Sequence, residues 1–137
     1  MSLIPEDYAP HFRKSAFTNP WEPLYSQVTD TQISLGTVLR EAHCNSRHII
    51  HGGFISALAD NAMGLSCVQL MKGQGREVKS LVTVNLSVDF TGMAKVGDWI
   101  ATESEVVKLG GSLGFVRCQL KTPNAVVARA NATFKLG

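Results

Sequence analysis

The chain has 137 residues, of which 45% are hydrophobic and 18% charged, and its formal net charge is +2. This length suits one domain with a substantial core, and the small charge gives no footprint for nucleic acid or a membrane surface. Three cysteines without a C-x-x-C pair favour free thiols. No basic segment followed by an apolar run marks a signal peptide, so we expect a cytoplasmic protein.

Residues 1–23 hold four of the five prolines and predict an N-terminal arm, which precedes a single domain at residues 24–137. We expect a helical turn near residues 11–15, and packing of the arm on the domain through Phe17 and Trp21. The domain is predicted to begin with two strands, at residues 25–28 and 31–41.

One long buried helix is the central prediction. Small and apolar residues run without proline from Phe54 to Met71, after His51-Gly52-Gly53 and before a glycine-rich stop. The run is barely long enough to cross a bilayer. Asp60 and Asn61 within it favour a core helix of a soluble protein over membrane insertion.

Strands are predicted again after the helix. Residues 82–90 alternate, which places Val82, Val84, Leu86, Val88 and Phe90 on one face and Thr83, Asn85, Ser87 and Asp89 on the other. Further strands are expected at residues 99–109, 113–121 and 125–136, with a tight turn at Gly110-Gly111. The whole pattern predicts an α+β fold, in which an antiparallel sheet wraps around the helix.

Asp60 is the first candidate for chemistry. A carboxylate among apolar helix residues is costly to bury unless it is paired or used in a reaction, although a place on the solvated edge of the helix stays open. Gly52 and Gly53 supply a second candidate, because backbone N–H groups at a helix start can hold a developing oxyanion. Alternatively, the two glycines only ease a tight turn.

The distance between these candidates predicts an assembly. Gly52 and Asp60 are separated by about 12 Å along a helix. One reacting carbonyl cannot accept a hydrogen bond from the Gly52 N–H and at the same time be attacked by a group that Asp60 activates. If both residues serve one reaction, they come from two chains, and the protein is a dimer with shared sites.

Several motifs together resemble a known family. Asn45, His51-Gly52-Gly53, Asp60, the strand at residues 83–90 and Ala94-Lys95-Val96-Gly97-Asp98 are similar to the hotdog-fold acyl-CoA thioesterases of the PaaI-like group. The similarity extends from about residue 19 to the C-terminus. It implies hydrolysis of coenzyme A thioesters without a metal or other cofactor, by side-by-side dimers that often pair into tetramers.

The resemblance also implies residue roles. The Gly52 N–H would polarise the thioester carbonyl, and Asn45 and His51 would shape that end of the site. Asp60 from the facing protomer would be the general base or the nucleophile, and Thr83 would orient the attacking water. We add three candidates for substrate contacts: Gly53, Ser56 and Asn61.

Each role has a structural alternative. Asn45 can turn its loop by bonding its own backbone, His51 can cap the helix, and Thr83 is a β-branched residue that strands favour anyway. Arg47, Lys95, Lys108 and Arg117 are candidates for the coenzyme A phosphates, or simply solvated charges.

Three other functions compete. His43, Cys44, His48 and His51 are all competent metal ligands, but their spacing fits no zinc pattern that we can name. A hydroxyacyl-thioester dehydratase of the same fold would pair a catalytic histidine with an acid on the helix, and the sequence signatures of such enzymes are absent here. A non-catalytic acyl-CoA binding protein is disfavoured, because it has no need of Asp60. No residue selects the acyl group.

Overall fold

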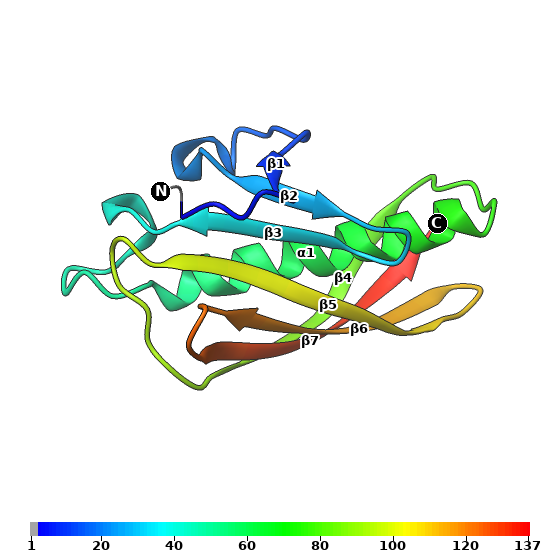
Figure 1. The fold of residues 1–137 in the computed structure, drawn as a ribbon. Coiled ribbons are helices and arrows are strands. Elements are labelled where there is room, and N and C mark those ends of the chain that lie inside the picture. Colours follow the sequence, from blue (N-terminus) through cyan, green and yellow to red (C-terminus); the bar gives the residue numbers. More distant parts are fainter. Residues whose placement is uncertain (1–2) are drawn as a thin grey trace.

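The computed structural model describes residues 3–137 as a seven-stranded antiparallel sheet curved around one long helix (Figure 1). The predicted α+β hotdog architecture is therefore confirmed. The sheet order is β1-β2-β3-β5-β6-β7-β4. The strands are β1 (Ala9–Pro10), β2 (Tyr25–Val28), β3 (Ile33–Val38), β4 (Leu81–Phe90), β5 (Trp99–Leu109), β6 (Leu113–Lys121) and β7 (Val126–Leu136).

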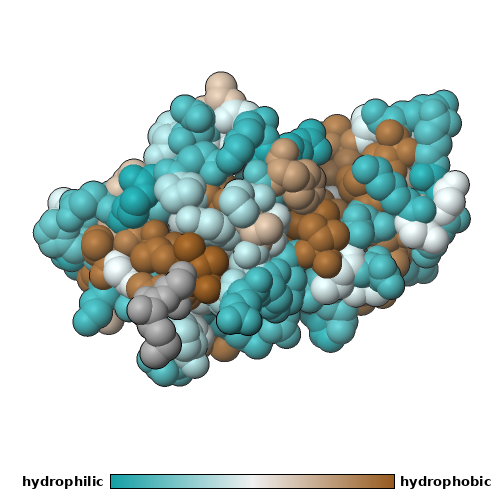
Figure 2. Space-filling view, turned by 45° about the horizontal axis from the view of Figure 1, so that its top comes forward, coloured by the Kyte–Doolittle hydropathy of each residue, from teal (hydrophilic) through white to brown (hydrophobic). Residues whose placement is uncertain are grey.

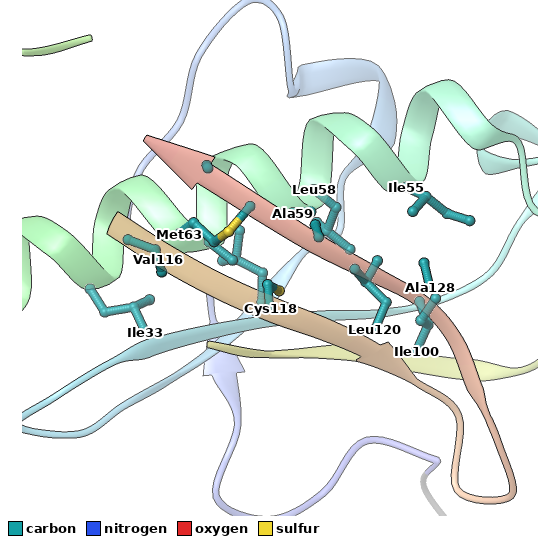
Figure 3. Close-up of a cluster of buried hydrophobic side chains, with 14 of the residues drawn as sticks. Ile33, Ile55, Leu58, Ala59, Met63, Ile100, Val116, Cys118, Leu120 and Ala128 are labelled. Carbon is teal, nitrogen blue, oxygen red and sulfur yellow. The ribbon is translucent and has the colours of Figure 1, made fainter. Parts of the chain in front are cut away.

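The helix α1 (Gly52–Gly73) supplies one side of the core. Leu58, Ala59 and Met63 point from it toward the sheet, where Leu120 and Cys118 lie (Figure 3). By length and composition this helix could cross a membrane, but 56% of the relevant window is buried inside the domain. The apolar run therefore serves as the core of the fold in this structure.

The arm departs from its prediction. No helix forms at residues 11–15, because residues 9–10 pair with β2 as β1 and the His11 N–H donates to the Leu24 carbonyl. A short 3-10 helix, η1 (Asn19–Trp21), follows instead. The Trp21 ring packs edge-on against Phe54 and the Phe17 ring against Trp21, which are the contacts expected of the arm.

The strand β4 contains a bulge that the sequence pattern did not predict. It lies at the edge of the sheet beside β7. Thr83 lies opposite Phe134 and Asn85 opposite Thr133, so Val84 is an extra residue in the ladder. A bulge shifts the alternation of side chains by one residue.

The prediction was therefore wrong for the first residues of β4, where it placed Val82 on the same face as Leu86 and Thr83 on the opposite face. Thr83, Leu86, Val88 and Phe90 lie opposite the buried residues of β7, on the helix side of the sheet. Val82, opposite the exposed Lys135, lies on the outer side. A strict alternation would have placed Thr83 outside, away from α1.

The face of the molecule drawn in Figure 2 is mainly hydrophilic, and apolar side chains reach it in separate patches. Of the exposed apolar side chains in the described residues, several belong to β4, where Val82, Val84 and Phe90 are 56%, 54% and 56% exposed. Because only one side of this strand is paired within the chain, a long and partly apolar edge is left open.

His43 is a fully buried histidine in the 3-10 helix η2 (Glu41–His43). Its Nδ1 accepts from the Arg40 N–H at 2.9 Å, its Nε2 lies 2.8 Å from the Trp21 carbonyl oxygen, and its ring stacks on Phe54. This arrangement requires the neutral ring with its proton on Nε2. Burial lowers the pKa of His43 below its usual value.

We expect the free energy of unfolding to fall as the pH drops below about 6.5, because the unfolded chain then binds a proton that the folded chain takes up less readily at His43. Denaturant titrations at neutral and mildly acidic pH measure this loss. His43→Asn should weaken the dependence, and burial of His11, whose pKa is also lowered, accounts for a remainder. His48→Gln, at an exposed histidine, is the control; an unaltered pH slope in His43→Asn would contradict the assignment.

Candidate active site

Asp60 and Thr83 meet between α1 and the edge strand. The Thr83 hydroxyl donates to Asp60 Oδ1 at 2.7 Å. Asp60 is half-buried on the helix, and the bulge at Val84 gives Thr83 the direction it needs to reach the carboxylate. The two residues are 23 positions apart in the chain. Their contact leaves the second carboxylate oxygen without a hydrogen-bond donor in the described part of the protein.

The pair lies in a cleft of about 600 Å³. Asn61 and Gly64 line it from the helix. The side-chain carboxamide of Asn61 makes no hydrogen bond within residues 3–137. The arm forms another wall through His11, Arg13, Ser15 and Thr18. Sequence reasoning missed these arm residues, because no periodic pattern ties the segment to α1.

The helix start is capped by His51, whose Nδ1 accepts from the Gly53 N–H at 2.8 Å. The Gly53 donor is therefore occupied. The Gly52 N–H makes no hydrogen bond within residues 3–137, so it remains available to an acceptor from outside. A side chain at Gly52 would crowd the Phe90 ring, since a Cβ there would lie 3.2 Å from it.

Asn45 turns the loop that leads into the helix. Its Oδ1 accepts from the Arg47 N–H at 2.9 Å and from the Ile49 N–H at 3.2 Å. This is the local backbone role that asparagine often has in loops. The contact shapes the entry to α1 from a distance and gives Asn45 a clear structural function.

The Ala94–Asp98 motif braces the same loop. Ala94 accepts from the Ile50 N–H, and the Val96 N–H donates to the His48 carbonyl. Asp98 closes the turn by accepting from the Lys95 N–H at 3.0 Å. These bonds hold the residues before His51 against the connection that leads into β5, and so fix where the helix begins.

Ser56 is placed differently from the cleft residues. Its hydroxyl donates to the Gly52 carbonyl at 2.9 Å, within the first turns of α1. It does not line the cleft around Asp60. Ser56 thus belongs to the Gly52 end of the helix and Asn61 to the Asp60 end.

The three histidines that could have contributed to a metal site are engaged separately. His43 is bonded to the backbone inside the core, His48 Nδ1 lies 3.0 Å from Glu41 Oε1, and His51 caps the helix. Between residues 3 and 137, no three His, Cys, Asp or Glu side chains gather closely enough to hold a metal ion.

A single chain keeps the two ends of the candidate site apart. The helix runs unbroken from Gly52 to Gly73. Gly52 and Asp60 are therefore separated by about 12 Å, the length expected from the helical rise. One carbonyl cannot contact the free N–H at the first residue while a group held by the second attacks it.

Comparison with known proteins identifies related sequences. A family model described as the thioesterase superfamily matches residues 48–129. A Pseudomonas aeruginosa protein described as an esterase is 36% identical over 138 residues, covering 99% of each chain. The human protein named acyl-coenzyme A thioesterase 13 is 25% identical over 124 residues, 85% of each chain.

Solved structures share the fold. A Streptococcus pneumoniae hypothetical thioesterase, determined with coenzyme A, superimposes with a TM-score of 0.75 at 19% identity, covering 85% of this chain and 90% of that one. The Escherichia coli PaaI protein superimposes with a TM-score of 0.73 at 16% identity, over 83% and 79% of the two chains. Both arrange a sheet and a helix as this chain does.

Proposed function

Because the chain belongs to the thioesterase superfamily and is a thioester hydrolase, we propose that its substrates are acyl-coenzyme A thioesters and that Asp60 carries the chemistry. The coenzyme A part is supported by relatives named acyl-CoA thioesterases and by a neighbouring structure that contains coenzyme A. The observation that carries the residue assignment is the 2.7 Å bond that holds the Asp60 carboxylate in the cleft.

The hydrolysis needs two groups. Asp60 accepts a proton from water as the oxygen of that water bonds to the thioester carbonyl carbon, and the Gly52 N–H donates to the oxyanion that develops. The C–S bond then breaks, and the leaving thiolate takes the proton from Asp60, which restores the carboxylate. Asp60 acting as the nucleophile, through a mixed anhydride that water cleaves, uses the same two groups.

Thr83 is a positioning residue in this scheme. Its hydroxyl fixes one carboxylate oxygen and leaves the other free to face the water or the carbonyl. A hydrogen bond to a charged group holds orientation more strongly than one between neutral groups. The bulge at Val84 thus serves the site, as bulges near active sites often do.

The open edge of β4 supports the proposed dimer. This strand runs beside α1 so that Thr83 meets Asp60 and Phe90 lies at Gly52. If two copies of β4 pair antiparallel about their middle, the Asp60 end of one chain comes beside the Gly52 end of the other. Each dimer would then contain two composite sites, and the exposed apolar residues of the edge would be covered.

Asp60→Asn keeps the size of the side chain and removes its charge. We expect kcat for hydrolysis of acyl-CoA esters to fall by roughly 100- to 10,000-fold, the usual contribution of a general base, with binding retained. Thiol release from aliphatic and phenylacetyl-type esters measures the change. If neither wild type nor variant hydrolyses any ester while both bind them, the protein is an acyl-CoA binding module and the catalytic assignment is wrong.

Thr83→Val removes the hydroxyl and preserves the β-branched shape. We expect kcat to drop by roughly 10- to 100-fold, the equivalent of one hydrogen bond to a charged group, with little change in KM. Thr83→Ser, which keeps the hydroxyl, is the matched control and should restore most of the rate. Equal losses in both variants would point to packing instead of positioning.

Subunit complementation tests the shared site. Gly52→Pro deletes the N–H, and the extended backbone of His51 and the first helical position both accept a proline. Because proline also places a Cβ 3.2 Å from the Phe90 ring, Gly52→Ala, which adds the same Cβ and keeps the N–H, is the control for this crowding. Gly52→Pro and Asp60→Asn should each be inactive, while an equal mixture of the two variants regains about a quarter of wild-type activity, since half of the dimers are mixed and each of these holds one intact site out of two. No recovery, despite mixed dimers seen by native mass spectrometry, would show that the site lies within one chain.

A further inference from the structure

The cleft beside Asp60 continues toward the end of α1. Its floor is one stripe of the helix, and its walls come from the arm, β4 and the connection at residues 78–80. The helix stripe consists of Asp60, Asn61, Gly64, Leu65, Val68 and Lys72. Apolar residues occupy the middle of the stripe and charges its two ends. The carboxylate lies at one end, and Lys72 at the other.

Three cations from three separate elements line this cleft: Arg13 of the arm, Lys72 in the last turn of α1, and Lys79 before β4. Asp60 is the only acid among the lining residues, all of which fall within residues 3–137. None of the three cations forms an ion pair in that part of the chain. By contrast, Lys14 and Arg117 are each paired with a glutamate.

The spacing suits a substrate that is bound at Asp60. Lys72 lies about 18 Å further along the helix, given the rise per residue. A thioester whose carbonyl is held near Asp60 can therefore place a second group near the cations only through a long, extended arm. The apolar middle of the stripe offers a surface for such an arm.

We propose that Arg13, Lys72 and Lys79 form an anion subsite that holds a negatively charged group of the thioester substrate. The proposal rests on the proposed function, because the distance to Lys72 is counted from a thioester carbonyl bound at Asp60. Two groups share the required chemistry: the phosphates of coenzyme A and a carboxylate at the far end of the acyl chain. The number of cations and the length of the extended pantetheine arm favour the phosphates.

The test uses two charge-matched variants of the full chain. Arg13→Gln, Lys72→Gln and Lys79→Gln are combined in one variant. Lys121→Gln, Arg129→Gln and Lys135→Gln are combined in the other, since these residues lie outside the cleft and none of them is a candidate for the coenzyme A phosphates. The ion pairs of Lys121 with Glu103 and of Arg129 with Asp89 lie at the surface, where such pairs contribute little. Both lose the same charge, so a general electrostatic effect appears in both.

Three substrates separate the sources of the anion: an acyl-CoA, the same acyl group on N-acetylcysteamine, and its ω-carboxylated form on N-acetylcysteamine. We expect the cleft variant alone to raise KM for the acyl-CoA by about tenfold or more, with kcat nearly unchanged and the uncharged thioester unaffected. A rise confined to the ω-carboxylated thioester would assign the same subsite to the acyl chain. Equal effects in both variants, or none in either, overturn the proposal.

Failure of the proposed function would look different. In that case the wild type hydrolyses none of the three thioesters. Calorimetric titration with coenzyme A and with the ω-carboxylated thioester then reports on the subsite directly. Weaker binding of either compound by the cleft variant alone supports the subsite, and unchanged binding of both refutes it.

Discussion

The bulge at Val84 is the constraint on which the candidate site depends. It allows one edge strand to present Thr83 to Asp60 and, a few residues later, Leu86 and Phe90 to the same helix. Without the extra residue, the two sets would face opposite sides of the sheet. The ladder with β7 absorbs the irregularity on the side of β4 that is paired within the chain. The contact with Asp60 and the helix-facing side of the strand are thus reconciled within ten residues.

The helix start solves a related conflict between stability and chemistry. An uncapped helix exposes several N–H groups, and a fully capped one leaves none for a substrate. His51 satisfies the donor of Gly53 and leaves that of Gly52 free. The loop before it is held by Asn45 from within and by the Ala94–Asp98 turn from outside. The Gly52 N–H therefore points in a fixed direction, although it lies at the first residue of the helix.

Local patterns in the sequence predicted the elements well where pairing is regular. The bounds of β5 and β6 and the extent of α1 follow from alternation and from glycine punctuation. The bulge was missed because Val84 is as good a strand residue as its neighbours, and no glycine marks it. The contact between Thr83 and Asp60, and the arm wall of the cleft, are long-range. They depend on how distant segments pack, which residue spacing does not encode.

Under the proposed pairing of two β4 strands, the open edge has a consequence for the folded monomer. A freshly folded monomer carries unpaired backbone groups flanked by exposed valines, which is the kind of template that recruits any extended peptide. Pairing in the proposed dimer and aggregation would then compete for the same strand, and the outcome would depend on how quickly two folded copies meet. Cellular yield of such a protein is governed by its rate of synthesis and by chaperone capacity as much as by the packing of its core.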